Sequence, residues 1–233
     1  MNRYNGLYSR TLDLVGDYAG DELFILEGDS LLLHCFSDDQ IDFTNGFQLL
    51  HATYLVEKFL AQLHQRKCNF HIAFFKKHAY GCIPPDVSRK LWPKYRLARK
   101  AILHHLLQNL PITLSSMRIG YFETYECEEF ERYLVSVDPY FLMCHDGASS
   151  GAHAGRRPGL TLENLELSSS DDDSNPSDVE EPGSEIATRE TGVMFRSMIH
   201  HFICRGYNIS LINSLECRDT KVSFVTICRY TED

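Results

Sequence analysis

The chain has 233 residues and a formal net charge of −9, and 43% of its residues are hydrophobic. This length fits one domain with an insertion or tails, and the hydrophobic content excludes a wholly disordered chain. No apolar run reaches the length of a membrane span, the first residues lack the apolar region of a secretory signal, and the eight cysteines form no CxxC pair. We therefore expect a reduced, soluble, cytoplasmic protein that makes no membrane contact.

The charge is distributed unevenly along the chain. From His64 to Pro111 there are ten basic residues and one acidic residue, a net charge of +9. From Tyr121 to Thr191 there are seventeen acidic residues and four arginines, a net charge of −13. A local basic segment is sufficient for nucleic-acid recognition, so the overall acidity does not exclude an anionic partner.

The N-terminal half predicts helices and strands in alternation. A helix is indicated where apolar residues recur every three or four positions, and a buried strand where a short run is apolar throughout. Prolines at the start of the second long helix and just after it mark its ends. The expected elements are a helical lead-in at Tyr8–Tyr18, a strand at Leu23–Leu26, a helix at Phe47–Gln65, a strand at Asn69–Phe75 and a helix at Pro93–Asn109.

The C-terminal half continues the alternation on both sides of an unusual segment. Residues 147–191 are rich in Gly, Ser, Asp, Glu and Pro and poor in aromatic residues, which predicts a disordered insertion. Residues 1–146 and 192–233 then form one domain, a three-layer α/β fold with a mainly parallel central sheet. The expected elements are a strand at Ile112–Leu114, a helix at Glu126–Val135, a strand at Pro139–Asp146, a helix at Val193–Arg205 and strands at Tyr207–Ile212 and Val222–Cys228.

Acidic residues follow or accompany several of these elements. Asp29 comes just after the first buried strand, Asp146 ends a later strand, and Asp219 follows the Tyr207–Ile212 strand. If the carboxyl ends of parallel strands meet at one edge, these three converge, and Glu57 reaches them from the helix. Oxygen ligands suit Mg²⁺ or Mn²⁺, and two such ions activate water for phosphodiester cleavage. The alternative is that each acid is an ordinary cap or a surface charge.

The basic segment is a second candidate site. Arg96, Arg99 and Lys100 share a face of the Pro93–Asn109 helix, and further cations flank Trp92. Cations neutralise phosphates, and aromatic rings stack on the bases of single-stranded RNA. The alternative is a solvated helix face with Trp92 in the core. The candidate RNA-binding residues are Lys76, Lys77, Arg89, Lys90, Lys94, Arg96, Arg99 and Lys100.

Four sequence blocks carry a family resemblance. The runs LFILEGDSLLL, ATYLVEKFLAQL, NFHIAFFKKHAY and YFLMCHD resemble the N-terminal region of the antiviral DExD/H-box helicase sixty family, superkiller-type RNA helicases of the cytoplasm. The resemblance implies a PIN-like, nuclease-type domain in which Asp29, Glu57, Asp146 and Asp219 occupy the acidic positions. It further implies that Asp29 and Asp146 hold the metal, while the other two acids complete the shell or position water.

The chain departs from that family in two respects. Lys76 and Lys77 stand where nuclease-type members carry an acidic loop, and no GxxxxGK[ST] loop for ATP is present. The first hypothesis is therefore a PIN-like module that binds single-stranded or structured RNA, with weak metal-dependent ribonuclease activity. The alternative is a catalytically inactive domain that docks protein partners in RNA decay, RNA surveillance or the antiviral response.

Overall fold

The computed structural model describes residues 7–13, 22–113, 118–147, 183–218 and 221–229. Its centre is one mixed sheet whose strands follow the order β1-β8-β6-β5-β2-β3-β4, with β7 paired to β8. The strands β2 (Leu23–Glu27), β3 (Asn69–Phe75), β4 (Ile119–Phe122), β5 (Phe141–Cys144) and β6 (Asn208–Leu211) are parallel. The strands β1 (Leu7–Asp13), β7 (Glu216–Arg218) and β8 (Lys221–Arg229) add antiparallel pairs at one side.

The inner strands are buried on both faces, as their uninterrupted apolar sequences require. On β2, Phe24 and Leu26 join one hydrophobic cluster, while Ile25 between them joins another. The rings of Phe24 and Phe141, on neighbouring strands, stack at 4.8 Å between centroids. Because successive side chains of a strand point to opposite faces, the sheet separates two cores.

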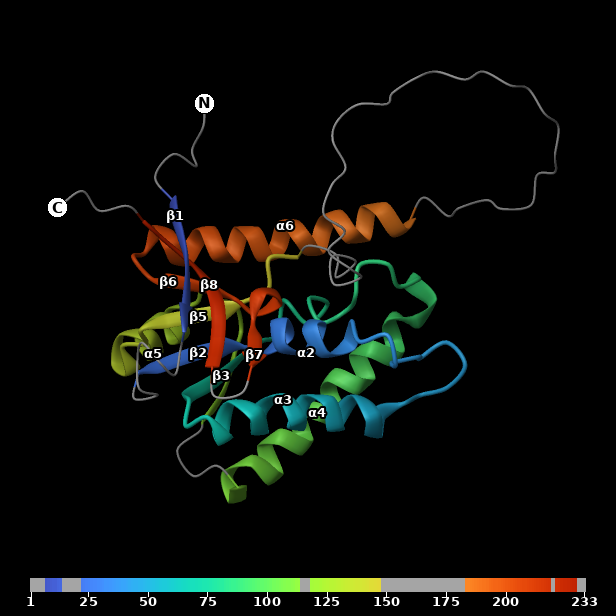
Figure 1. The fold of residues 1–233 in the computed structure, drawn as a ribbon. Coiled ribbons are helices and arrows are strands. Elements are labelled where there is room, and N and C mark those ends of the chain that lie inside the picture. The colour runs from blue at the N-terminus through green and yellow to red at the C-terminus, as the bar shows by residue number, and fades with distance from the viewer. Residues whose placement is uncertain (1–6, 14–21, 114–117, 148–182, 219–220, 230–233) are drawn as a thin grey trace, which may run out of the picture.

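Helices cover both faces of the sheet, which confirms the predicted three-layer α/β fold (Figure 1). The first face carries α2 (Gly28–Phe36), α3 (Leu49–Gln65) and α4 (Trp92–Thr113), and the second carries α5 (Glu128–Val137) and α6 (Gly183–Cys204). Two short 3₁₀ turns, η1 (Arg89–Leu91) and η3 (Ile212–Ser214), complete the described elements. None of the helices in the described ranges is both long and apolar enough to cross a membrane.

Several predicted elements differ from the structure. The helical lead-in is wrong, because Leu7–Asp13 forms the strand β1, and residues 14–18 lie outside the described residues. The strand predicted at Ile112–Leu114 is also wrong, because α4 continues to Thr113 and the next strand, β4, begins at Ile119. The last predicted helix begins earlier, at Gly183, so the C-terminal end of the predicted insertion is helical. Residues 148–182 of that insertion lie outside the described residues.

Candidate functional site

The strand β2 passes directly into α2, and Glu27 is the residue at the junction. Its carboxylate accepts hydrogen bonds from the backbone N–H groups of Asp29 (3.1 Å) and Ser30 (2.5 Å), which caps the helix. Glu27 is 3% exposed. Burial, and next the charge of Asp29, raise the pKa of Glu27 to about 8. Sequence reasoning missed this residue, although a carboxylate ending an apolar strand was the available signal.

Gly28 makes this junction possible. A Cβ built on Gly28 would lie 2.4 Å from ring atoms of Phe74, a fully buried residue of β3. Only glycine therefore allows the first turn of α2 to lie this close to the neighbouring strand. The close approach places the N-terminus of α2, with Asp29 and Ser30, over the carboxyl end of the parallel sheet.

Asp29 is paired with Arg99 of α4, seventy positions away in the sequence. The guanidinium donates to both carboxylate oxygens, from Nε to Oδ1 at 2.5 Å and from Nη2 to Oδ2 at 2.8 Å, and Nη2 also donates to the Phe75 carbonyl at 3.1 Å. The side chain of Asp29 is 1% exposed and that of Arg99 is 4% exposed. Burial raises the pKa of Asp29, and Arg99 lowers it in turn. Because arginine keeps its proton, the contact is a buried bidentate ion pair.

Asp146 lies at the same edge as Asp29 but makes different contacts. The backbone N–H of His145 donates to Ser30 Oγ at 2.8 Å, which ties the end of β5 to the start of α2. His145 is buried, and burial lowers its pKa to about 4, so the ring is neutral and accepts from the Gly147 N–H at 2.9 Å. The carboxylate of Asp146 is one-third exposed and lies 3.7 Å from the His145 ring.

The remaining predicted acids lie elsewhere. Glu57 accepts a hydrogen bond from His105 of α4 at 2.7 Å, and its side chain is half exposed. Asp219 lies outside the described residues. The structure therefore brings Asp29 and Asp146 to one edge through Ser30 and His145, while Glu57 links α3 to α4.

These contacts determine whether a divalent ion fits. Both oxygens of Asp29 face a guanidinium, and both oxygens of Glu27 face helix N–H groups. A cation is thus already present beside Asp29, and a second one would meet its positive charge. Across the part of the chain that the structure describes, no three His, Cys, Asp or Glu side chains are placed to hold a metal. The described residues at this edge therefore do not fit the Mg²⁺ or Mn²⁺ that the resemblance to a nuclease-type domain implies.

Four side chains form a continuous row on the surface, which we call the cation–aromatic ladder. The Arg89 guanidinium lies 5.5 Å from the centre of the Trp92 ring, and the Trp92 and Tyr80 rings lie 5.5 Å apart. The Arg96 guanidinium lies 4.8 Å from the Tyr80 ring centre and donates to the Tyr80 hydroxyl at 3.1 Å. Arg89, Arg96 and Tyr80 are exposed, whereas Trp92 is partly buried, packs against the first hydrophobic cluster and donates its ring N–H to the Val87 carbonyl at 3.2 Å.

The other predicted RNA-binding residues have different roles. Arg99 is buried, and Lys94 donates to the carbonyls of Phe43 (2.5 Å) and Gly46 (3.1 Å), holding the loop before α3. Lys76 pairs with Glu123 at 3.4 Å across two half-exposed side chains. Lys77, Lys90 and Lys100 are exposed. Of the eight candidates, Arg99 and Lys94 are therefore engaged in contacts that hold the fold, and Lys76 forms a surface ion pair.

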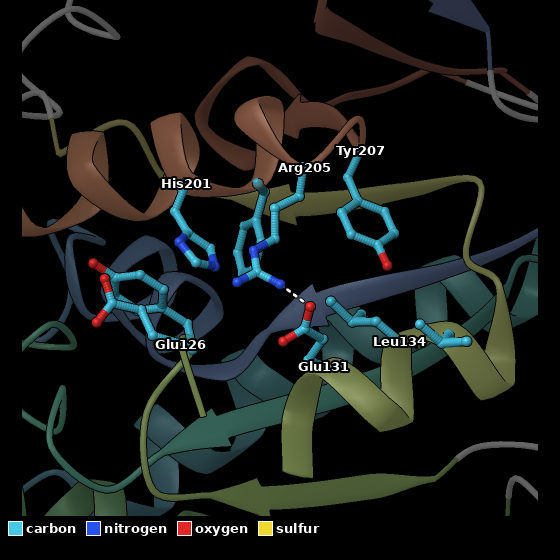
Figure 2. A pocket seen from close by; sticks show the side chains of 9 residues that line it. Glu126, Glu131, Leu134, His201, Arg205 and Tyr207 are labelled. Atoms are coloured by element: carbon cyan, nitrogen blue, oxygen red, sulfur yellow. Dashed lines mark hydrogen bonds and ion pairs between the residues drawn. The ribbon is translucent and has the colours of Figure 1, made fainter. Parts of the chain in front are cut away.

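A cavity of about 330 Å³ lies between α5 and α6, on the opposite face of the sheet from α4 (Figure 2). Arg205 extends from the end of α6 toward Glu131 of α5 and pairs with it. The labelled lining residues are Glu126, Glu131, Leu134, His201, Arg205 and Tyr207. Sequence reasoning did not predict a site at any of them.

The fold is a three-layer α/β domain in which a buried arginine, Arg99, lies among the acidic residues at the carboxyl edge of the sheet. A family model described as the PIN-like domain of the ATP-dependent RNA helicase DDX60 matches residues 8–154, more than half of the chain. The chain belongs to this family of DDX60 PIN-like domains. The predicted resemblance is thereby confirmed.

Two curated relatives are helicases. One is a probable ATP-dependent RNA helicase, DDX60-like, of Homo sapiens, 28% identical over 130 residues, which are 56% of this chain and 7% of that protein. The other is an uncharacterised helicase of Dictyostelium discoideum, 30% identical over 82 residues, which are 31% of this chain and 4% of that protein. The chain thus matches less than a tenth of the length of these relatives. No solved structure matches it.

Proposed function

We propose that this PIN-like domain is a metal-independent RNA-binding module of a DDX60-type helicase, and that the cation–aromatic ladder contacts single-stranded RNA. The ladder is the observation that carries the proposal. Guanidinium groups neutralise phosphates, and the exposed ring of Tyr80, with the partly buried ring of Trp92 beside it, offers a surface on which bases stack. The helicase names of the curated relatives support a nucleic-acid partner, and a cytoplasmic location fits such a partner.

Cleavage is the less favoured activity. A metal-dependent ribonuclease needs carboxylate oxygens that are free to ligate ions, and a second carboxylate nearby. The Asp29 oxygens bind Arg99, and the Glu57 carboxylate binds His105. The Lys76–Lys77 pair adds positive charge at the carboxyl end of β3, which favours holding RNA over holding a divalent cation.

Trp92 gives a direct measurement of RNA binding, because it is the single tryptophan of the chain. Stacking of a base on or beside this ring quenches its fluorescence, so titration with an oligouridine should lower the emission. Replacing Tyr80 with alanine removes a ring and the partner of Arg96. We expect Tyr80→Ala to weaken binding about tenfold or more, because one stacked base contributes about 1–3 kcal/mol.

The matched control is Lys58→Ala, which removes an exposed cation of α3 that is not part of the ladder. Its affinity for oligouridine should equal that of the wild type. Binding should fall steeply with added salt and should persist in EDTA. Equal affinities of wild type and Tyr80→Ala would contradict the role of the ladder. Cleavage of the oligouridine in Mn²⁺ would contradict metal independence.

A further inference from the structure

The cavity between α5 and α6 has a chemistry that the RNA-binding proposal does not use. Its floor includes Phe202, which is buried, and Leu134, while Tyr125 and Tyr207 contribute rings. Its polar groups come from both helices and from the turn before α5 (Figure 2). An apolar floor with convergent polar groups and a volume of about 330 Å³ is the usual form of a small ligand-binding site.

The charges of the lining disfavour an anion. The one permanent cation, Arg205, is already paired with Glu131. Burial, and next the charge of Arg205, lower the pKa of His201, so this ring is neutral at pH 7. Two carboxylates, Glu126 and Glu131, therefore face one guanidinium. A phosphate or carboxylate ligand would meet a net negative charge, whereas a cation would be attracted.

The first turn of α5, the helix that lines one side of the cavity, is acidic as well. Glu128 and Glu129 lie exposed in the first turn of α5, and the nearby basic residue Arg132 is 3.8 Å from Glu128. Val135, on the same helix, is 72% exposed and lines the cavity. A partner that fits this face therefore combines positive charge with some apolar contact. A nucleic acid lacks that combination, and a basic protein segment has it.

Arg205 shows how a guanidinium is accommodated here. Its head group lies between the two helices and bonds the Glu131 carboxylate, and Tyr207 lies beside it (Figure 2). A second guanidinium would find Glu126, which accepts from Tyr125, and the faces of the neighbouring rings. Arginine suits such a site better than lysine, because its planar group is weakly hydrated, stacks on rings and binds carboxylates with two donors.

We infer that this cavity binds an arginine side chain from a basic segment of a partner protein. The arginine stem lies along Leu134 and Phe202, and its head group reaches Glu126 at the mouth. The acidic first turn of α5 attracts the flanking basic residues of the segment. Leu134 and Phe202 belong to the second hydrophobic cluster, whereas Trp92 of the cation–aromatic ladder packs against the first, so the two proposed sites are distinct.

The test uses a fluorescent basic peptide with a central arginine, and the same peptide with citrulline at that position. Citrulline keeps the shape of arginine but carries no charge. Fluorescence anisotropy with the full chain should show tighter binding of the arginine peptide. We expect Glu126→Gln to weaken this binding about fivefold to tenfold, through loss of one charge contact. The matched control, Glu57→Gln, removes an exposed acid on the other face and should bind like the wild type.

The position of binding is measured separately. The arginine peptide should shift the NMR signals of the His201 ring, which lines the cavity, and should leave the fluorescence of Trp92 unchanged. Equal binding of the arginine and citrulline peptides would overturn the inference, as would an equal loss in Glu126→Gln and Glu57→Gln. A shift of His201 by oligouridine instead of the peptide would also overturn it, and would assign the cavity to RNA.

Discussion

Arg99 and Asp29 join three elements at the carboxyl end of the sheet. Asp29 belongs to the first turn of α2, Arg99 to α4, and the Phe75 carbonyl that Arg99 also contacts ends β3. The Arg99 guanidinium further lies over the Phe74 ring, 5.4 Å from its centre. Because burial removes both charges from water, each depends on the other, and removing one leaves an uncompensated charge in the core.

Because each charge depends on the other, we expect a large interaction free energy between Asp29 and Arg99. Asp29→Asn leaves Arg99 buried without a counter-charge, and should lower the free energy of unfolding by about 3–5 kcal/mol. Combining it with Arg99→Met should cost much less than the sum of the two single substitutions. Urea unfolding of the wild type, both single variants and the double variant measures this coupling. Glu57→Gln, which breaks a half-exposed pair with His105, should cost no more than about 1 kcal/mol. Additive single effects would contradict a buried ion pair.

Glu27 makes stability depend on pH in a definite direction. Its pKa is about 8 in the folded chain, against an ordinary value of 4.5, mainly because burial penalises the charged form. The folded state therefore binds this proton more tightly than the unfolded state does. The contribution of Glu27 to stability is fully present below about pH 4.5 and is lost as pH rises through 8. His145, whose pKa falls to about 4, acts in the opposite direction below pH 6.5.

The variant Glu27→Gln isolates this effect, because glutamine cannot ionise and its carbonyl still caps α2. We expect wild type and variant to have similar free energies of unfolding at pH 5. At pH 8 the wild type should have lost about 4 kcal/mol relative to the variant, since each unit of pKa shift corresponds to about 1.4 kcal/mol. Urea unfolding at several pH values gives the comparison, and the His145 contribution cancels in the difference. A difference that does not change with pH would show that folding does not raise the pKa of Glu27.

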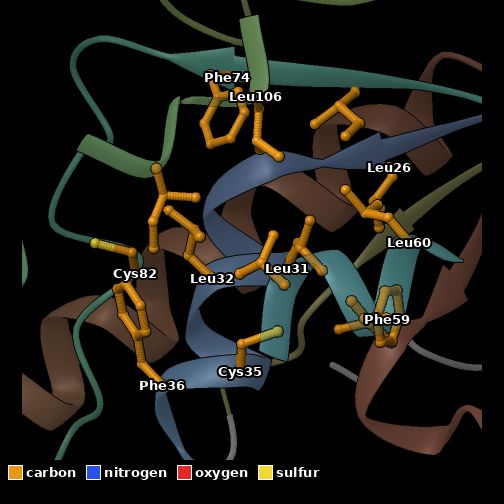
Figure 3. Close-up of a cluster of buried hydrophobic side chains, with 14 of the residues drawn as sticks. Leu26, Leu31, Leu32, Cys35, Phe36, Phe59, Leu60, Phe74, Cys82 and Leu106 are labelled. Atoms are coloured by element: carbon orange, nitrogen blue, oxygen red, sulfur yellow. The ribbon is translucent and has the colours of Figure 1, made fainter. Parts of the chain in front are cut away.

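At the scale of elements, burial explains which helices the sequence predicts. The helix α3 has one buried face, so its apolar residues recur at helical spacing. In α2 nearly every residue is buried, as Figure 3 shows for Leu31, Leu32, Cys35 and Phe36 within the core. A helix that is buried on nearly all sides has no exposed polar face and so no amphipathic periodicity to detect, and its Gly28–Ser30 start resembles a turn. The sequence therefore predicts β2 correctly and misses the helix that follows it.

The error at the end of α4 has a different cause. Pro111 was expected to follow the helix, because proline lacks an N–H group and disrupts a helix interior. The helix nevertheless extends to Thr113, and the following strand begins at Ile119. Only Phe122 of β4 is fully buried, since this strand forms the edge of the sheet. A short, half-exposed edge strand carries a weak apolar signal, so the sequence placed it too early.

For the whole molecule, the sequence predicts the parallel sheet and the presence of acids at its carboxyl edge. It identifies Asp29 and Asp146, because each follows a recognisable buried strand. It does not identify Arg99 as the partner of Asp29, because that contact joins residues seventy positions apart on different helices. The same limit applies to the cavity between α5 and α6, whose charges come from segments far apart in the chain. Local sequence patterns predict most of the helices and strands. The roles of the charged residues depend instead on contacts between residues that are far apart in the sequence.

Because the Arg99 guanidinium already lies beside Asp29, we expect that divalent ions do not change the stability of the whole domain. A ligand that binds only the folded state at a hundred times its Kd stabilises that state by about 2.7 kcal/mol, which raises the Tm of a chain of this size by several degrees. Scanning calorimetry of the wild type should show the same Tm in EDTA, Mg²⁺ and Mn²⁺. In Arg99→Ala the guanidinium no longer competes, so we expect Mn²⁺ to raise the Tm of this variant. A rise in the wild type would instead show that the acidic edge holds metal beside Arg99, and would make ribonuclease activity the first function to assay.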